Sequence, residues 1–221
     1  DRYMSDVEIT GVETYLVANP WKPWVFVEIE TDAGVTGIAE ATAHDKPRTI
    51  AKAIEEMSDY FIGKDPFDTE QIWLEMYRDE WFSKNVINTT VCSAVDMACW
   101  DIKGKLLDKP VYYLLGGQVH GDELRAYANG WYTDTGGEPE GFARAAERVV
   151  DDGYDAMKFD PFGTAWQSMT RKEQNKAVDI VRAVREAVGP DVDLLIECHG
   201  RFSAGQAVEI ARELDEFDPT W

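Results

Sequence analysis

Hydrophobic and polar positions alternate along two early stretches of the chain, residues 7–17 and 24–31, which are also rich in β-branched residues. Alternation with a period of two is typical of a β-strand with one buried face. Asp32-Ala33-Gly34 then supplies a tight turn, so the second strand is expected to pair with a third at residues 35–41. These patterns predict a meander of three strands.

The next stretches change to the spacing of amphipathic helices. Apolar residues recur three and four positions apart over residues 47–61, 68–81 and 89–106. Strands followed by a layer of helices predict an α+β arrangement for the first part of the chain.

After the glycine pair at 116–117, strands alternate with helices. Strands are expected at 124–129, 156–160 and 193–199, and helices at 140–152, 172–188 and 203–214. Ser203 is the expected N-cap of the last helix. Alternation of this kind predicts βα units and a parallel sheet, with a fourth strand beginning at 218–221.

Three βα units cannot close a barrel, which takes eight of them. The second part of the chain is therefore either a short open α/β domain or a truncated part of a longer one. The abrupt end at Trp221, where the fourth strand should begin, favours truncation.

The charge balance narrows the classes of partner. Forty-two acidic residues against 22 basic ones give a net charge of −20, which disfavours nucleic acid and anionic membranes as partners. An acidic face could recruit a basic protein, but the acids are spread over the whole chain. Dispersed acidity favours the alternative, a solvated surface adapted to high salt in a halophilic host.

Apolar runs are too short to cross a bilayer, and the N-terminus has no apolar signal-peptide core. Three cysteines without disulfide or zinc spacing indicate a reducing compartment. We therefore expect a cytoplasmic protein.

Candidate chemistry lies at the end of the third expected strand of the second part. A period of two puts Glu197 and His199 on the same face. A carboxylate is a hard oxygen ligand suited to Mg²⁺, and an imidazole can supply a proton near neutral pH. A Glu–His ion pair that caps the strand explains the spacing equally well.

The segment Ser93-Ala-Val-Asp-Met-Ala-Cys-Trp-Asp-Ile-Lys-Gly-Lys105, with Leu-Leu-Gly-Gly at 114–117, resembles the mandelate racemase/muconate lactonizing group of the enolase superfamily. The resemblance implies an α+β N-terminal capping domain at 1–121. It also implies the first part of a TIM-type (β/α) barrel at 122–221, here truncated after about three βα units. Asp96, Trp100 and Lys103 in this segment are expected to be helix and interface residues.

The motif Glu197-Cys-His199-Gly-Arg201 resembles that of sugar-acid dehydratases. By that resemblance Glu197 binds Mg²⁺, and His199 is the general acid that protonates the departing hydroxyl to give a 2-keto-3-deoxy acid. Arg201 is expected to contact the substrate. Many family members have Asp as the metal ligand, so Glu197 is one methylene longer. The other metal ligands and the base come from later strands in this family.

Lys158-Phe-Asp160 occupies the place of the family's Lys-x-Lys motif. Lys158 is expected to hold the substrate carboxylate or the developing enolate charge, and Asp160 to accept hydrogen bonds from substrate hydroxyls. A salt bridge between Lys158 and Asp160 is the alternative. Asp160 cannot replace the second lysine base of a racemase, which favours elimination.

Two residues of the first domain are weaker candidates for substrate contact. Trp21 could close the pocket from the loop between the first two strands, or it could pack on the domain surface. His44 lies in a segment that resembles a specificity loop, whereas His120 is expected to be structural.

The main alternative is a racemase, epimerase or cycloisomerase of the same superfamily. A non-catalytic acidic binding or assembly module is the alternative from another class. The glycine pairs do not open a helix after a strand, which excludes a dinucleotide fingerprint. By resemblance we also expect a homo-oligomer, a dimer or octamer, that binds a small sugar acid.

Overall fold

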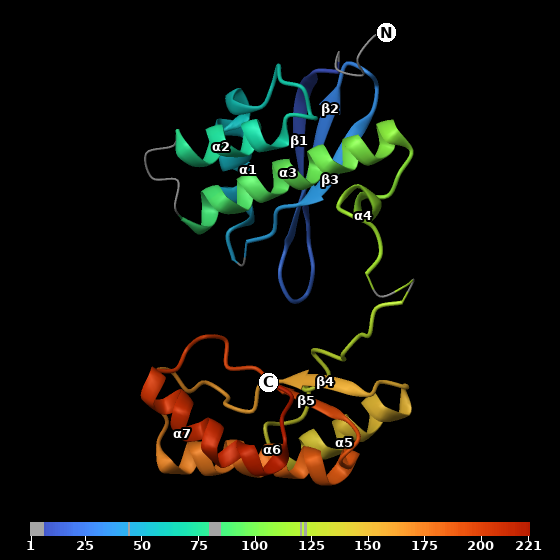
Figure 1. Cartoon of the computed structure of the whole chain (residues 1–221). Coiled ribbons are helices and arrows are strands. Elements are labelled where there is room, and N and C mark those ends of the chain that lie inside the picture. Colours follow the sequence, from blue (N-terminus) through green and yellow to red (C-terminus); the bar gives the residue numbers. More distant parts are fainter. Residues whose placement is uncertain (1–6, 44, 80–84, 120, 122) are drawn as a thin grey trace. The chain divides into compact units, whose positions relative to one another are not determined.

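The computed structural model describes residues 7–43, 45–79, 85–119, 121 and 123–221. The chain divides into two compact units, Asp1–Asp122 and Glu123–Trp221 (Figure 1). No helix within the described ranges is both long and apolar enough to cross a membrane.

The N-terminal unit contains an antiparallel sheet of three strands, which confirms the predicted meander. Its strands are β1 (Ile9–Val17), β2 (Trp24–Thr31) and β3 (Thr36–Glu40), in the order β1-β2-β3. Gly34 makes the turn between β2 and β3 with φ of 71°, a conformation that glycine adopts without steric cost. The buried side chains of β2 alternate along the strand, as the period of two predicts.

Helices cover this sheet. They are α1 (Pro47–Glu56), the 3₁₀ helix η1 (Ser58–Tyr60), α2 (Thr69–Arg78), α3 (Val86–Leu107) and the short α4 (Val111–Leu114). The predicted helix at 47–61 is therefore two helices, because Ser58 and Asp59 favour turns and the tighter 3₁₀ turn is followed by the fully buried Phe61. The end of the predicted helix at 68–81 lies partly outside the described residues.

The long helix α3 carries the segment that resembles the family signature. It begins earlier than predicted, because the Asn85 side chain accepts hydrogen bonds from the backbone N–H groups of Ile87 and Asn88, at 2.9 and 3.0 Å. Gly37 of β3 lies so close to α3 that a Cβ there would overlap the carbonyl oxygen of Ala98. The fully buried apolar face of α3 thus forms the centre of this unit's core.

Polar side chains of the signature segment bind the rest of the unit. Asp101 accepts a hydrogen bond from the backbone N–H of Ile38 at 2.9 Å. Because β3 is an edge strand of the described sheet, this N–H has no neighbouring strand on that side, and Asp101 takes the place of one. Buried Lys103 donates to Thr69 Oγ1 at 2.9 Å, and its Nζ lies 4.3 Å from the centroid of the Trp100 ring. In the N-terminal unit, these contacts give the segment a structural role.

The C-terminal unit is a parallel sheet covered by helices. Its strands β4 (Ala156–Phe159) and β5 (Asp193–Ile196) pair in parallel. Its helices are α5 (Pro139–Asp151), α6 (Arg171–Val188), α7 (Ala204–Leu214) and the 3₁₀ helix η2 (Asp215–Phe217). The Ser203 hydroxyl accepts the N–H of Gln206 at 3.3 Å, which confirms the predicted N-cap of α7.

Backbone pairing extends this sheet at both edges. Beyond β5, Thr220 N–H donates to Leu194 O at 2.8 Å and Ile196 N–H donates to Trp221 O at 2.7 Å. The predicted fourth strand therefore starts to form beside β5. On the other edge, the predicted strand at 124–129 is wrong over most of its length, because only Ala128 pairs with β4. The unit has the strand order and connections of the first part of a (β/α) barrel.

Candidate active site

Five charged or titratable side chains gather at the carboxyl ends of β4 and β5. Lys158 is in β4, and Asp160 is the first residue after that strand. Glu197 is the first residue after β5. His199 and Arg201 come next in the loop before α7. Loops at this end of parallel strands carry the active sites of (β/α) barrels.

Lys158 and Glu197 form an ion pair between neighbouring strands. Lys158 Nζ lies 3.1 Å from Glu197 Oε2, and both side chains are largely buried. The hydrogen bond to Glu197 raises the pKa of Lys158. The backbone N–H of His199, and then Lys158, lower the pKa of Glu197. The pair therefore holds a fixed positive and a fixed negative charge at the strand ends.

Asp160 is the centre of a second cluster of hydrogen bonds. Its Oδ1 accepts from Arg201 Nη2 at 2.7 Å and from the backbone N–H of Phe162 at 2.9 Å. Its Oδ2 lies 2.9 Å from His199 Nδ1. The Asp160 side chain is only 11% exposed, whereas that of His199 is 56% exposed. Asp160 is thus fixed in place, and the far side of the His199 ring is open.

The turn after β5 differs from the predicted strand at 193–199, because β5 ends at Ile196. Glu197 Oε1 accepts the backbone N–H of His199 at 2.7 Å, and His199 itself has a left-handed φ of 52°. A side chain that bonds to the backbone two residues later favours a turn over a strand. Glu197 and His199 therefore reach the same end of the sheet through a turn and not through strand alternation.

The pairing also differs from both alternatives that the sequence left open. Glu197 pairs with Lys158, and His199 pairs with Asp160, so each pair joins the end of β4 to the end of β5. A salt bridge within one strand, Lys158 with Asp160, was the expected alternative and is not the arrangement found. Strand register brings these partners together, and a single strand's pattern cannot reveal it.

Arg201 braces the loop that carries His199. Its guanidinium pairs with Asp160 and lies 5.4 Å from the centroid of the Phe202 ring, which in turn packs edge-on against Phe162. Its buried Nε has no hydrogen-bond partner within the described residues. Asp160 and Arg201, which were both predicted to contact substrate, thus form an ion pair with each other.

Two tyrosines beside this cluster were not predicted from the sequence. The ring of Tyr127 lies 5.9 Å from Lys158 Nζ. Half-buried Tyr132 has its pKa raised, first by burial and then by the negative charge of Asp160. Tyr127 directly precedes Ala128, the residue that pairs with β4, and Tyr132 follows Ala128 by four residues. The position of Tyr127 next to a strand end was the signal that could have identified it.

The two weaker candidates belong to the N-terminal unit. Trp21 lies in the loop between β1 and β2 and is 74% exposed, with Lys22 Nζ 4.2 Å from the centroid of its ring. Most of the Trp21 side chain is therefore exposed. His44 and His120 lie outside the described residues.

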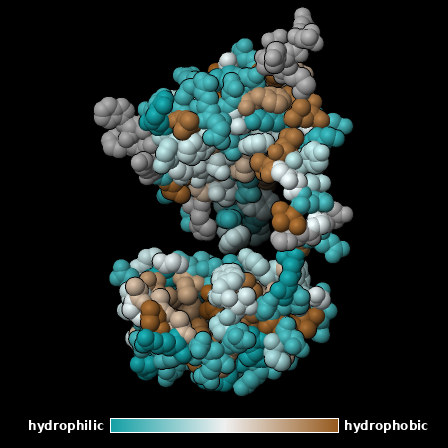
Figure 2. Space-filling model, viewed as in Figure 1, coloured by the Kyte–Doolittle hydropathy of each residue, from teal (hydrophilic) through white to brown (hydrophobic). Residues whose placement is uncertain are grey.

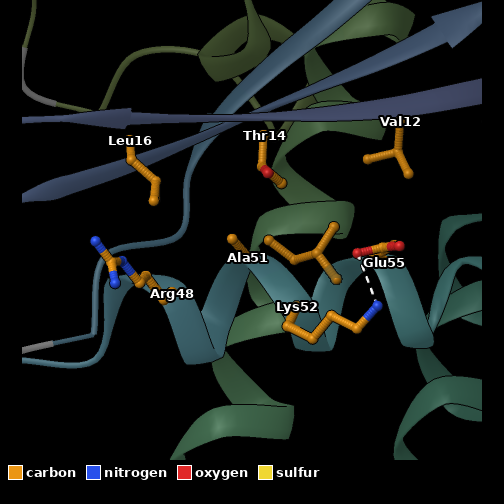
Figure 3. Close-up of a pocket in the computed structure, with 8 residues that line it drawn as sticks. Val12, Thr14, Leu16, Arg48, Ala51, Lys52 and Glu55 are labelled. Carbon is orange, nitrogen blue, oxygen red and sulfur yellow. Dashed lines mark ion pairs between the residues drawn. The ribbon is translucent and has the colours of Figure 1, made fainter.

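A groove of about 390 Å³ lies between β1 and α1 (Figure 3). Val12, Thr14 and Leu16 line one side, and α1 lines the other, where Lys52 and Glu55 pair at 3.0 Å. Among the described residues, the lining includes no histidine and one carboxylate, Glu55, which is already bound to a lysine. The groove therefore offers poorer chemistry than the strand ends of the C-terminal unit.

Glu197 is a candidate oxygen ligand for a metal at the strand ends. Glu197 has the carboxylate oxygens that a hard cation prefers. However, no group of three or more histidine, cysteine or acidic side chains close enough to hold a metal occurs among the residues described. A metal held by Glu197 would therefore need further ligands that the described residues do not bring near it.

Two family models match the chain. Residues 10–116 match the "mandelate racemase / muconate lactonizing enzyme, N-terminal domain", and residues 141–221 match the "enolase C-terminal domain-like" model. Among solved structures, a member of the enolase superfamily from Salmonella Typhimurium has a TM-score of 0.87 and 31% identity. It is covered over 60% of its length and covers 96% of this chain.

Three curated relatives are sugar-acid dehydratases. The D-gluconate dehydratase of Thermoproteus tenax is 42% identical over 88% of this chain and 39% of its own length. The D-gluconate/D-galactonate dehydratase of Picrophilus torridus is 38% identical over 96% of this chain and 56% of its own length. The D-xylonate dehydratase of Haloferax volcanii is 35% identical over 98% and 53%, respectively.

The chain spans about half the length of these curated relatives. Both family models and the relatives agree with the architecture seen in the structure, a capping unit followed by the first strands and helices of a barrel. The chain belongs to the enolase superfamily, in its mandelate racemase/muconate lactonizing group.

Proposed function

We propose that the complete protein dehydrates a sugar acid to a 2-keto-3-deoxy acid. The observation that carries this proposal is the position of His199, an exposed imidazole beside a lysine–glutamate pair at the barrel strand ends. The relatives named as gluconate, galactonate and xylonate dehydratases support the choice of substrate class.

Each residue of the cluster has a proposed task. Lys158 binds the substrate carboxylate and stabilises the negative charge that develops there as the C2 proton leaves. His199 gives its proton to the C3 hydroxyl, which departs as water, and the resulting enol tautomerises to the ketone. We assign the base that takes the C2 proton to another part of the barrel.

We further propose that Glu197 is one ligand of Mg²⁺. A bound Mg²⁺ would supply Lewis acidity, which makes the C2 proton of a carboxylate acidic enough to remove. Glu197 would then exchange part of its interaction with Lys158 for the metal, leaving the Lys158 ammonium to the substrate carboxylate. We also propose that residues 1–121 form the capping domain and residues 122–221 the first part of the barrel.

Substitution of Glu197 tests this assignment. In the complete protein, Glu197→Gln should weaken Mg²⁺ binding and slow dehydration of D-gluconate, D-galactonate and D-xylonate, because the amide lacks the carboxylate charge. Metal titration by calorimetry and product formation measure the two effects. Glu209→Gln, an exposed surface acid of α7, is the matched control. Unchanged metal affinity and rate in Glu197→Gln would remove Glu197 from the site.

A racemase or epimerase of the same superfamily is the second candidate, but it needs a base on each face of the substrate. The residue in the place of the second lysine is Asp160, whose carboxylate is occupied by Arg201. Elimination is therefore favoured over racemisation. A non-catalytic acidic module is disfavoured by the exposed His199 at the strand ends.

We also propose a cytoplasmic location, in line with the cysteine pattern of the sequence, and a small sugar acid as the binding partner instead of nucleic acid or membrane. A homo-oligomer, dimer or octamer, remains our expectation from the family resemblance. Light scattering of the purified protein measures it directly.

A further inference from the structure

We infer that Asp160 is a positioning residue that fixes the tautomer and orientation of His199. The inference rests on the proposed function, in which His199 donates a proton to the leaving hydroxyl. It replaces the expectation that Asp160 contacts substrate hydroxyls.

The Asp160 side chain is held in one orientation. Oδ1 accepts two hydrogen bonds, from Arg201 Nη2 and the backbone N–H of Phe162. The side chain is almost fully buried. A carboxylate held by two donors, one of them a guanidinium, presents its second oxygen in one direction only.

The fixed Asp160 carboxylate determines which nitrogen of the His199 imidazole carries the proton. Asp160 Oδ2 lies 2.9 Å from His199 Nδ1, and an ionised carboxylate only accepts hydrogen bonds. Nδ1 must therefore carry a proton, so the neutral ring is the Nδ1–H tautomer and Nε2 is the atom that gains and releases the catalytic proton. A carboxylate that orients a histidine in this way is common behind catalytic and metal-bound imidazoles.

Among the residues that the structure describes, the support of the His199 ring comes from Asp160. The backbone of His199 is held by Glu197 Oε1, but its side chain is more than half exposed. Within the described residues, the bond to Asp160 is the ring's recorded polar contact. Arg201 then acts indirectly, by clamping Asp160.

Asp160→Asn tests the inference in the complete protein. The amide oxygen can still accept from Arg201 and Phe162, but the amide NH₂ faces Nδ1 and forces the ring into the Nε2–H tautomer. We expect the ¹⁵N shifts of the neutral imidazole, measured without substrate at the alkaline end of a pH series, to change from Nδ1–H to Nε2–H. His199→Gln identifies the signal. We expect kcat to fall about 10- to 100-fold or more with KM changed little.

The matched control is Asp155→Asn, because Asp155 and Asp160 flank the same strand β4 and Asp155 pairs with Arg125 at its opposite end. This variant should keep the tautomer and kcat of the unmodified protein. Nε2–H in the unmodified protein, or a higher KM with unchanged kcat in Asp160→Asn, would overturn the inference. If the tautomer switches as expected but no sugar acid is dehydrated by the unmodified protein, the proposed function fails and the positioning of His199 by Asp160 stands.

Discussion

Buried Lys103 of the N-terminal unit is stabilised in a different way from the charged side chains at the strand ends. At the strand ends, Lys158 and Asp160 each have a partner of opposite charge from the loop after β5. In the capping unit, buried Lys103 has instead a threonine hydroxyl and the faces of Trp100 and Phe67. An ammonium without a directly bonded carboxylate is costly to bury, and burial accordingly lowers the pKa of Lys103.

The lowered pKa of Lys103 predicts a pH dependence of stability. Between that pKa and the ordinary lysine value, the unfolded chain binds more protons than the folded one, so the free energy of unfolding rises with pH. Below the folded pKa, Lys103 is protonated in both states and contributes no slope. Lys103→Met should remove this rise. Urea unfolding from pH 7 to about 10 measures it, and equal slopes in the two proteins would contradict the prediction.

Individual helices depend on caps that the sequence reveals. Helix α6 begins with a capping box, in which the Thr170 hydroxyl accepts the N–H of Glu173 and Glu173 accepts the N–H of Thr170 at 2.7 Å.

At the opposite end of the sheet from the candidate site, Arg125 pairs with Asp155 and Asp193, which ties the beginnings of β4 and β5 together.

Loss of the cap on α6 should destabilise the C-terminal unit. Thr170→Ala removes the hydroxyl from the capping box and should lower the free energy of unfolding by about 1 kcal/mol. Chemical denaturation measures the change. Thr164→Ala, an exposed threonine on the same loop, is the control. If both substitutions cost the same, the cap contributes nothing of its own.

Elements with a local pattern were predicted well, and contacts between elements were not. The three strands of the capping unit follow from alternation, and the N-cap of α7 follows from Ser203. The strand at 124–129 was wrong because its pairing depends on neighbours and not on its own composition. The turn after β5 was missed because the hydrogen bond from His199 N–H to Glu197 competes with strand geometry.

At the scale of the whole molecule, net charge is the dominant feature. Figure 2 shows mostly hydrophilic residues over the visible face of each unit, with smaller apolar patches. Forty-two acidic residues against 22 basic ones make the folded chain repel itself at low salt. Salt at molar concentration reduces the screening length to about 3 Å, which removes most of this repulsion.

We therefore expect the melting temperature to rise as KCl increases from about 0.1 M to above 1 M. A variant with the exposed acids Glu56, Asp151 and Glu216 replaced by Gln, Asn and Gln should show a smaller rise, since it carries less charge to screen. Scanning calorimetry measures both. A melting temperature that does not rise with KCl would contradict the adaptation to high salt.

The most direct test of the central claim separates proton abstraction from loss of water. In the complete protein with Mg²⁺, His199→Asn should slow dehydration of the preferred sugar acid about 10²- to 10⁴-fold, while exchange of its C2 proton with D₂O continues, because the base is another residue. His120→Asn, at a histidine that the sequence analysis assigns a structural role, is the control. Dehydration by His199→Asn at the unmodified rate, or no dehydration of any sugar acid by the unmodified protein, would contradict the account.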